Sequence, residues 1–340
     1  MQDGVPGPLR ADDPREISGY VLRARVGEGG MGTVYLSHTP GGRPVALKVI
    51  RREYARDAEF RVRFAREVAA ARRVSGYHLL PVVDHDTEGH RPWFATHYVP
   101  GLPLDAALDV HGPLPVDTVF RLTGALAGAL DAVHAAGVVH RDIKPGNLLL
   151  AADGPWLLDF GIARAAGALT LTTVGRLIGS PKHMSPEHAL GRGLTPASDV
   201  FALGLLAAEA ATGQHPYGRG HGLAVAARIA GTDREPPRLD HHPQPLRQLL
   251  EVCLAARPEE RPAAREVAEM CREALGGDGG RGPGDFAGWL PDPVASAVAR
   301  IGTATRPRPS SYTPTYVPTV RDPPAAGRPR PVRRSPGPSR

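Results

Sequence analysis

Apolar residues recur along this chain with two different spacings. Between residues 20 and 99, short apolar runs alternate with glycines and polar turns, which is typical of β-strands. Within that region, residues 57–74 place apolar side chains three and four positions apart, which indicates one helix. From residue 119 onward the patterns are mainly helical, beginning with residues 119–134. The chain is therefore expected to be α+β, with a small antiparallel β part carrying one helix and a larger, mainly helical part.

The two ends of the chain lack this periodicity. Residues 1–18 are rich in proline, aspartate and arginine, and are expected to form a loose leader. Residues 277–340 are rich in glycine, proline and arginine, and are expected to be mostly disordered, with one short amphipathic helix at about residues 286–301. Residues 19–276 are therefore the predicted folded domain.

The composition of the chain indicates its charge distribution and its expected location. The 340-residue chain has a formal net charge of +6, and much of its excess arginine lies near the C-terminal end. A solvated basic tail is the simpler interpretation of that charge, and a patch for nucleic acid or a membrane surface is the alternative. Cys253 and Cys271 show no metal or redox spacing and fit a reducing compartment, so a cytoplasmic location is expected. Signal-peptide and long apolar patterns are absent from the sequence, so no membrane span is expected.

Residues 140–147 are a polar stretch between two apolar elements, with the sequence His-Arg-Asp-Ile-Lys-Pro-Gly-Asn. The run Leu148-Leu149-Leu150 that follows indicates a short buried strand. Burial of many polar groups in such a loop costs free energy, so they are expected to be paired or used for chemistry. A second acid, Asp159, ends the next apolar run. Asp142 and Asp159 are therefore expected to share one task, for which metal-bound phosphate is the candidate.

A glycine cluster, Gly27-Glu28-Gly29-Gly30-Met31-Gly32, joins two short strand-like runs. Backbone N–H groups of glycine can approach phosphates because no Cβ is in the way. A dinucleotide-binding loop requires a helix after the glycines, but Val34-Tyr35-Leu36 indicates a strand. The cluster therefore predicts the tip of a hairpin, either simply flexible or covering a phosphate.

Lys48 and Glu67 are charged residues in apolar surroundings. Lys48 interrupts the strand-like run at residues 45–50, and Glu67 shares a helical face with two phenylalanines. A carboxylate on an apolar face needs a partner or becomes protonated. Lys48 is the natural partner of Glu67, and a salt bridge with Arg63 on the same helix is the alternative. Lys48 has its own alternative, in which it extends to solvent.

This ordered set of motifs resembles the catalytic core of eukaryotic-type protein kinases, including those of bacteria. The resemblance rests on His-Arg-Asp-x-Lys-x-x-Asn at residues 140–147, Asp-Phe-Gly at residues 159–161, the glycine cluster and Lys48. Lys144 resembles the Ser/Thr branch of the family. The resemblance implies a bilobal protein-kinase-like fold, with a small lobe at about residues 19–97 and a large lobe at about residues 98–276. It also implies transfer of the γ-phosphate of ATP to serine or threonine hydroxyls of proteins.

The resemblance also implies which residues bind ATP. The glycine loop would cover the phosphates, and Lys48, paired with Glu67, would hold the α- and β-phosphates. Apolar side chains would enclose the adenine, and backbone groups of residues 97–99 would bind its edge. The expected nucleotide-binding residues are Val26, Gly27, Glu28, Gly29, Gly30, Met31, Gly32, Val34, Ala46, Lys48, Glu67, Thr96 (the gatekeeper position), His97, Val99, Leu149 and Asp159.

By the same resemblance, the catalytic residues are Asp142, Lys144 and Asn147. Asp142 would accept or orient the proton of the substrate hydroxyl, and Lys144 would neutralise the transferring phosphate. Asn147 and Asp159 would bind Mg²⁺, with Mn²⁺ as a second option, because such cations prefer hard oxygen ligands. His140 is expected to be a packed loop histidine rather than a catalytic one.

Three threonines, Thr170, Thr172 and Thr173, cluster in the expected activation segment, residues 162–184. They are either parts of a polar loop or sites of autophosphorylation, in which case Arg141 would pair with the added phosphate. Autophosphorylation implies a transient homodimer. Phosphorylated threonines in the tail would offer a docking site to a phosphothreonine-binding partner.

Protein substrates are favoured by residues 180–187, which resemble the substrate platform of protein kinases. In that family, Glu187 would pair with Arg261, and Asp199 would bind the backbone of the catalytic loop. This platform argues against a small-molecule phosphotransferase. The sequence is also compatible with a pseudokinase scaffold and with a nucleic-acid-associated protein acting through its basic tail, although no nucleic-acid partner is expected.

Overall fold

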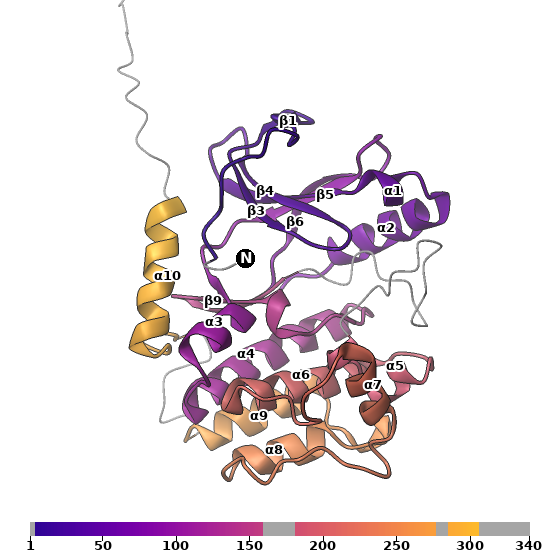
Figure 1. Ribbon diagram of the computed structural model, residues 1–340, viewed down its shortest axis with the longest axis vertical. Coiled ribbons are helices and arrows are strands. Elements are labelled where there is room, and N and C mark those ends of the chain that lie inside the picture. The colour runs from indigo at the N-terminus through magenta and orange to yellow at the C-terminus, as the bar shows by residue number, and fades with distance from the viewer. Residues whose placement is uncertain (1–3, 159–180, 277–284, 306–340) are drawn as a thin grey trace, which may run out of the picture. The chain divides into compact units, whose positions relative to one another are not determined.

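The computed structural model describes residues 4–158, 181–276 and 285–305. The chain forms a strand-rich small lobe followed by a helical large lobe, as the sequence predicts (Figure 1). The expected Asp159, Thr170, Thr172 and Thr173 sites lie outside the described residues, as does most of the expected disordered tail.

The small lobe is built on a five-stranded antiparallel sheet in the order β3-β4-β5-β7-β6. One face of this sheet is covered by a cluster that includes Tyr35, Leu47 and Trp93, together with residues of a short hairpin, β1–β2. The strands are β1 (Glu16–Ile17), β2 (Tyr20–Val21), β3 (Ala24–Glu28), β4 (Gly32–His38), β5 (Pro44–Ile50), β6 (Val82–Asp86) and β7 (Trp93–His97).

The main helix of the small lobe, α2 (Ala58–Ala71), follows a short helix, α1 (Arg52–Ala55). Asp57 caps α2 by accepting hydrogen bonds from the backbone N–H groups of Glu59 and Phe60, at 2.9 and 3.1 Å. Its buried face carries Phe60, Phe64, Val68 and Ala71, at the spacing that predicted the helix. This face packs into the main hydrophobic core, which fixes the side of the sheet on which α2 lies.

The large lobe surrounds two long helices that lie against each other, α4 and α6 (Figure 1). From Ser198 to Ala210 every residue of α6 except Glu209 is buried, which fits a sequence that is apolar on almost every side. Gly204 of α6 lies close to Cys253, where an added Cβ would come within 2.9 Å of the Cys253 Cβ. The helices are α3 (Leu104–His111), α4 (Val116–Ala135), α5 (Pro186–Ala189), α6 (Pro196–Thr212), α7 (Gly222–Ala230), α8 (Leu246–Cys253) and α9 (Ala264–Ala274).

A small sheet lies where the lobes meet. It consists of β8 (Leu102–Pro103), β9 (Leu148–Ala151) and β10 (Gly154–Leu157), in the order β10-β9-β8. The connection between the lobes, residues 97–101, enters this sheet directly and is called the hinge below. Gly101 lies so close to β9 that an added Cβ would be 3.0 Å from the Leu150 carbonyl oxygen.

The first residues differ from the loose leader expected from composition. Gly7 exchanges two backbone hydrogen bonds of 2.8 Å with Arg25 of β3. Asp13 is buried, and its carboxylate accepts a hydrogen bond of 2.6 Å from the Tyr35 hydroxyl. Composition indicated a solvated segment, but Asp13 has specific partners in the sheet, so residues 4–15 are held against the small lobe.

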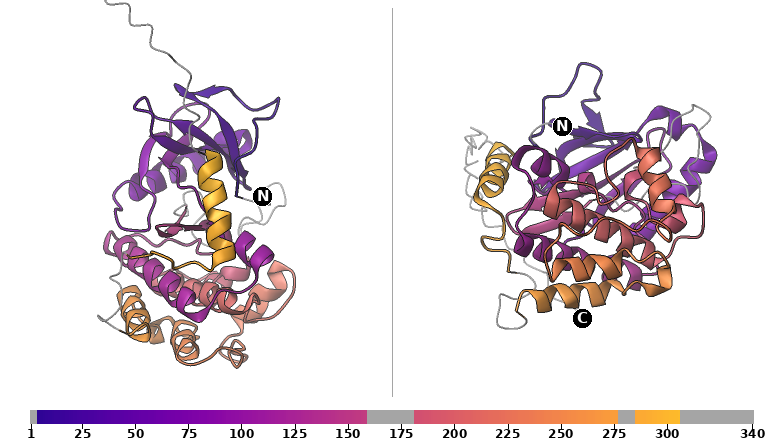
Figure 2. Two further views of the ribbon diagram at one scale, coloured as in Figure 1. Left: turned by 90° about the vertical axis from the view of Figure 1, so that its left-hand side faces the viewer. Right: turned by 60° about the horizontal axis from the view of Figure 1, so that its bottom comes forward.

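The C-terminal part also packs more tightly than expected. Helix α10 (Asp292–Thr305) stands where a short helix at about residues 286–301 was predicted. Its buried face lies beside β8, β9 and α3 (Figures 1 and 2). No helix in the described part of the chain combines the length and apolar character needed to cross a bilayer.

Candidate active site

The polar loop at residues 140–147 brings its three expected catalytic residues together. The Asp142 carboxylate oxygen Oδ2 accepts hydrogen bonds of 2.8 Å from both Lys144 Nζ and Asn147 Nδ2. Asn147 Nδ2 also donates to the Asp142 backbone oxygen at 3.0 Å. The side chains of Asp142 and Lys144 remain 14% and 24% exposed. The group is therefore ordered and still accessible from outside.

The backbone of this loop is held in an uncommon conformation. Arg141 has φ = +68°, a left-handed value that is costly for a residue with a side chain. The buried Asp199 carboxylate stabilises it by accepting the backbone N–H groups of His140 and Arg141, at 2.7 and 2.8 Å. His134 Nε2 lies 2.8 Å from the same carboxylate. Asp199 was expected in this position, whereas His134, on the preceding helix, was not identified from the sequence.

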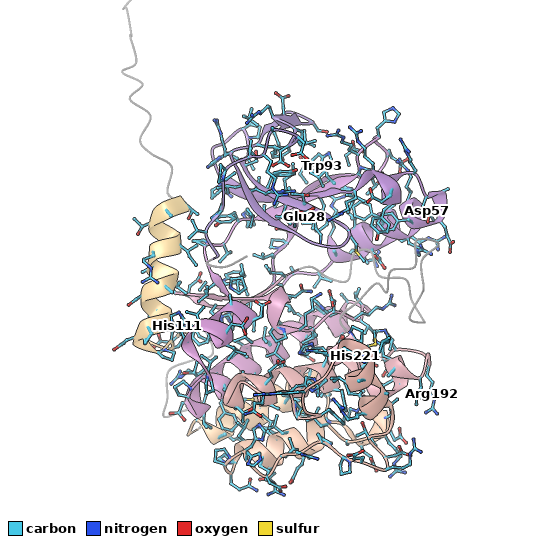
Figure 3. All side chains as sticks on the ribbon, viewed as in Figure 1. Glu28, Asp57, Trp93, His111, Arg192 and His221 are labelled. Atoms are coloured by element: carbon cyan, nitrogen blue, oxygen red, sulfur yellow. The ribbon has the colours of Figure 1, made fainter. Side chains whose placement is uncertain are left out.

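The glycine cluster forms the turn between β3 and β4. Its base is closed by a hydrogen bond of 2.9 Å from Gly29 N to the Gly32 carbonyl oxygen. Arg51 binds it from the side, donating to the Gly29 carbonyl oxygen at 3.1 Å and to Glu28, labelled in Figure 3, at 2.9 Å. Gly30 has open space where a Cβ would be, whereas a Cβ on Gly32 would lie 2.3 Å from the Val49 carbonyl oxygen. The tip of the loop is therefore open and its base is tightly packed.

One face of the small-lobe sheet is only half covered. Strand register aligns Val34 with Lys48, and Ala46 with Thr96, so these four side chains share a face. All four are half-buried, whereas the alternate residues on the opposite face of β5 are buried. Leu149 of β9 is also half-buried between two buried leucines. The apolar side chains of Val34, Ala46 and Leu149 form a half-covered apolar strip, which carries one cation, Lys48.

The Lys48 ammonium group lies 5.8 Å from the centre of the Phe94 ring. Phe94 is its neighbour on β7, so the lysine side chain follows the half-covered face of the sheet. The hinge begins where β7 ends, and Tyr98 N donates a hydrogen bond of 3.1 Å to the Pro44 carbonyl oxygen at the start of β5. His97 and Val99 flank this anchored residue, and both are half-buried.

Comparison with known proteins identifies this arrangement. Residues 20–271 match the family model described as the protein kinase domain, which is most of the chain. The chain belongs to the protein kinase family. It is 43% identical over 307 residues to the probable serine/threonine-protein kinase PkwA of Thermomonospora curvata, covering 89% of this chain and 40% of that protein. It is 41% identical to the serine/threonine-protein kinase AfsK of Streptomyces coelicolor, covering 85% of this chain and 36% of that protein.

Solved structures agree with this assignment. The kinase domain of PknI from Mycobacterium tuberculosis is similar to this chain with a TM-score of 0.61 and 32% sequence identity. The match covers 76% of this chain and 96% of the PknI chain. The predicted bilobal protein-kinase-like fold is therefore confirmed. The chain spans about two fifths of the length of the curated relatives named above.

Within the part of the chain that the structure describes, Glu67 does not form the ion pair with Lys48 that the sequence suggested. Among the ion pairs of the described residues, none joins Glu67 to Lys48, and Glu67 Oε2 is buried without a hydrogen-bond partner. Burial raises the pKa of Glu67 to about 7, although Arg141 and Arg63 oppose the shift. The helical pattern correctly placed Glu67 on a buried face, but it could not give the distance from α2 to β5.

Glu187 and Arg261 form the buried pair that the resemblance implied. The two carboxylate oxygens accept hydrogen bonds of 2.8 and 3.0 Å from Arg261, and Ser198 Oγ donates to Glu187 at 2.6 Å. Burial alone would raise the pKa of Glu187, but these donors and the arginine charge lower it to about 2. Arg261 also lies over the Phe201 ring at 4.8 Å, so the pair ties α5, which carries Glu187, to α6.

Proposed function

We propose that this chain is an active serine/threonine protein kinase. The observation that carries the proposal is the convergence of Lys144 and Asn147 on the Asp142 carboxylate. The relatives named above support the same class of activity, since both are serine/threonine-protein kinases by name. Because the chain covers only part of those relatives, its activity is inferred from its own residues as well as from theirs.

The catalytic loop fits phosphoryl transfer to a hydroxyl. Two donors orient the Asp142 carboxylate, which would accept or orient the proton of an incoming serine or threonine hydroxyl. Lys144, 2.8 Å from that carboxylate, would offset the negative charge of the transferring phosphate. Such chemistry depends mainly on position and charge, which the Asp199 anchor provides by fixing the loop backbone.

The half-covered apolar strip and the glycine loop fit ATP. Val34, Ala46 and Leu149 are half-buried apolar residues of the kind that enclose a planar base. The open space at Gly29 and Gly30 allows backbone N–H groups to approach phosphates. Lys48 would bind the α- and β-phosphates from the strand below them.

The donor set also fits a hard divalent cation, for which we propose Mg²⁺ ahead of Mn²⁺. Asn147 uses its amide nitrogen to bind Asp142, so its amide oxygen is the atom suited to a cation. The expected second ligand, Asp159, lies outside the described residues. When bound, such a cation supplies charge neutralisation for the phosphate groups.

Protein substrates and autophosphorylation are parts of the same proposal. The Glu187–Arg261 pair supports a platform for protein rather than small-molecule substrates. Transfer to Thr170, Thr172 or Thr173 would require two copies to meet transiently, and a phosphothreonine-binding partner at the tail would follow from similar transfer there. Because ATP is a cytoplasmic substrate, the proposal places the reaction in the cytoplasm.

The test is a measurement of intact mass before and after incubation of the purified chain with Mg-ATP. Asp142→Asn is the matched control, because it keeps the size of the side chain and removes the carboxylate. The wild type is expected to gain phosphates and the variant to gain none. If the wild type binds ATP but modifies neither itself nor a generic protein substrate, the chain is a scaffold and the proposal is wrong.

A further inference from the structure

The C-terminal residues 285–305, called the C-terminal brace below, lie outside the matched family model, which ends at residue 271. They therefore need an explanation of their own. Four residues of α10 are almost completely buried, namely Val294, Ala297, Val298 and Ile301, with Ile301 only 1% exposed. Burial of this kind requires a complementary surface on the kinase domain.

The first part of the C-terminal brace attaches to the large lobe. Trp289 is buried, and its Nε1 donates a hydrogen bond of 3.0 Å to the Ala151 carbonyl oxygen at the end of β9. The Trp289 carbonyl oxygen accepts a hydrogen bond of 3.1 Å from Thr118 of α4. The start of the brace is therefore fixed to the strand that carries Leu149, the expected floor of the nucleotide site.

The C-terminal brace also contacts the segment between α2 and β6 and lies near the hinge. Phe286 packs edge-to-face against His78 with ring centres 4.9 Å apart, and His78 lies between α2 and β6. His78 in turn bonds β10, with Nδ1 2.8 Å from the Pro155 carbonyl oxygen. At its other end the brace approaches the hinge, where burial raises the pKa of Tyr98 to about 12 and the nearby Thr305 side chain opposes this shift. The view at the left of Figure 2 shows α10 running past the junction of the lobes.

Ile301 of α10 makes a further contact, with the N-terminal segment beside the hinge. The ideal Cβ position of Gly4 lies 2.8 Å from Ile301 Cδ1 and 3.2 Å from the Gly101 carbonyl oxygen. The N-terminal segment, the hinge and α10 therefore meet at Ile301. The hinge backbone is held on one side by the bond from Tyr98 N to Pro44 and on the other by this packed junction.

We propose that the C-terminal brace is part of the nucleotide-binding apparatus, and that Ile301 and Thr305 are positioning residues for the hinge. The inference rests on the proposed function, in which hinge backbone groups bind the edge of the adenine. A hydrogen-bonding edge discriminates between bases only if its atoms are held in place. The brace thus contributes to ATP affinity and to selection of adenine over guanine, without touching the nucleotide.

The experiment uses the full chain with single substitutions. Ile301→Ala removes the packed junction, and Thr305→Val removes the hydroxyl near Tyr98, which also donates to the Ile301 carbonyl oxygen at 3.0 Å. Thr303→Val is the matched control, because the Thr303 hydroxyl is exposed and bonds within the helix to the Ala299 carbonyl oxygen. Val267→Ala, at a fully buried site on α9, is the control for general loss of stability. The readouts are KM for ATP, KM for a peptide substrate, kcat, melting temperature, and the ratio of kcat/KM for ATP to that for GTP.

Ile301→Ala is expected to raise KM for ATP about five- to tenfold and to lower the ATP-to-GTP ratio, with KM for the peptide unchanged. Thr305→Val is expected to raise KM for ATP about two- to threefold. Val267→Ala is expected to lower the melting temperature without changing KM for ATP, and Thr303→Val to change neither. If Ile301→Ala does not fold, Thr305→Val decides the question.

The proposal is overturned if both brace variants keep KM for ATP and the ATP-to-GTP ratio of the wild type, whatever happens to their melting temperatures. An equal rise in KM for ATP and for the peptide would also overturn it, since that indicates a general disturbance. A wild type that transfers no phosphate would instead refute the proposed function, and the inference with it. A wild type that is active, with unaltered brace variants, refutes the inference alone.

Discussion

Removal of Arg261 is expected to destabilise this kinase domain strongly. Its side chain is fully buried, and it is the main partner of the buried Glu187 carboxylate. The pKa of Glu187 falls from an ordinary value of 4.5 to about 2. At about 1.4 kcal/mol per pKa unit, this difference corresponds to roughly 3 kcal/mol of stability at neutral pH. Loss of one partner of a buried pair typically costs about 3–5 kcal/mol, which agrees with that estimate.

The variant to measure is Arg261→Met, which keeps most of the length of the side chain and removes its charge. The free energy of unfolding would be obtained from urea denaturation at pH 7 and at pH 4. Because the folded-state pKa of Glu187 is lowered, its contribution to stability is complete above about pH 4.5 and is lost as the pH falls toward about 2. The difference between wild type and variant is therefore expected to be largest at pH 7 and to narrow at pH 4.

Arg257→Met is the matched control. Arg257 lies in the same loop and pairs with Glu260, but both side chains are largely exposed. Its replacement is expected to give a urea unfolding curve that matches the wild-type curve within experimental error. The reasoning fails if Arg261→Met loses less than about 1 kcal/mol at pH 7, or if the difference from wild type does not depend on pH.

Three further changes test other parts of the structure. Glu67→Gln is expected to stabilise the protein at pH 8 by up to about 3 kcal/mol and not at pH 4. The reason is that the raised pKa of Glu67 makes wild-type stability fall as the pH rises from 4.5 to about 7, and equal unfolding free energies at pH 8 would contradict it. Gly32→Ala is expected to lower the melting temperature, since its Cβ would lie 2.3 Å from a carbonyl oxygen of β5, whereas Gly30→Ala has open space. Asp199→Asn is expected to reduce kcat about 100-fold while the circular dichroism spectrum stays unchanged, because the amide NH2 group replaces an oxygen that accepts a backbone N–H of the catalytic loop. An unchanged kcat would show that the bonds from Asp199 to the loop are dispensable.

Helices, strands and the catalytic loop, which depend on residues close together in the sequence, were predicted well. Apolar spacing placed a helix at residues 119–134, and the structure has α4 at Val116–Ala135. The catalytic-loop residues lie within eight positions of one another, so their convergence follows from a single tight loop. The strands were also located, because β2 to β7 all lie within the strand-like region predicted at residues 20–99.

Contacts between distant segments could not be predicted in the same way. The pattern of α2 shows that Glu67 faces inward, but only the packing of the helix decides that Arg141 and Arg63, rather than Lys48, are the charges that oppose the rise of its pKa. Composition suggested that both ends of the domain would be loose. Specific partners, such as Tyr35 for Asp13 and Ala151 for Trp289, hold those ends in place, and no local pattern signals such pairs.

The meeting of Gly4, Gly101 and Ile301 has a practical consequence for work with this protein. A fragment trimmed to the family boundaries, residues 20–271, would lack both the N-terminal segment and the C-terminal brace. It would expose the apolar surface of β8, β9 and α3 that α10 covers, and the edge of β3 that Gly7 pairs with. Exposed apolar patches and unpaired strand edges promote self-association. Purified fragments should therefore extend from about residue 4 to about residue 305, or aggregation will be mistaken for a property of the kinase.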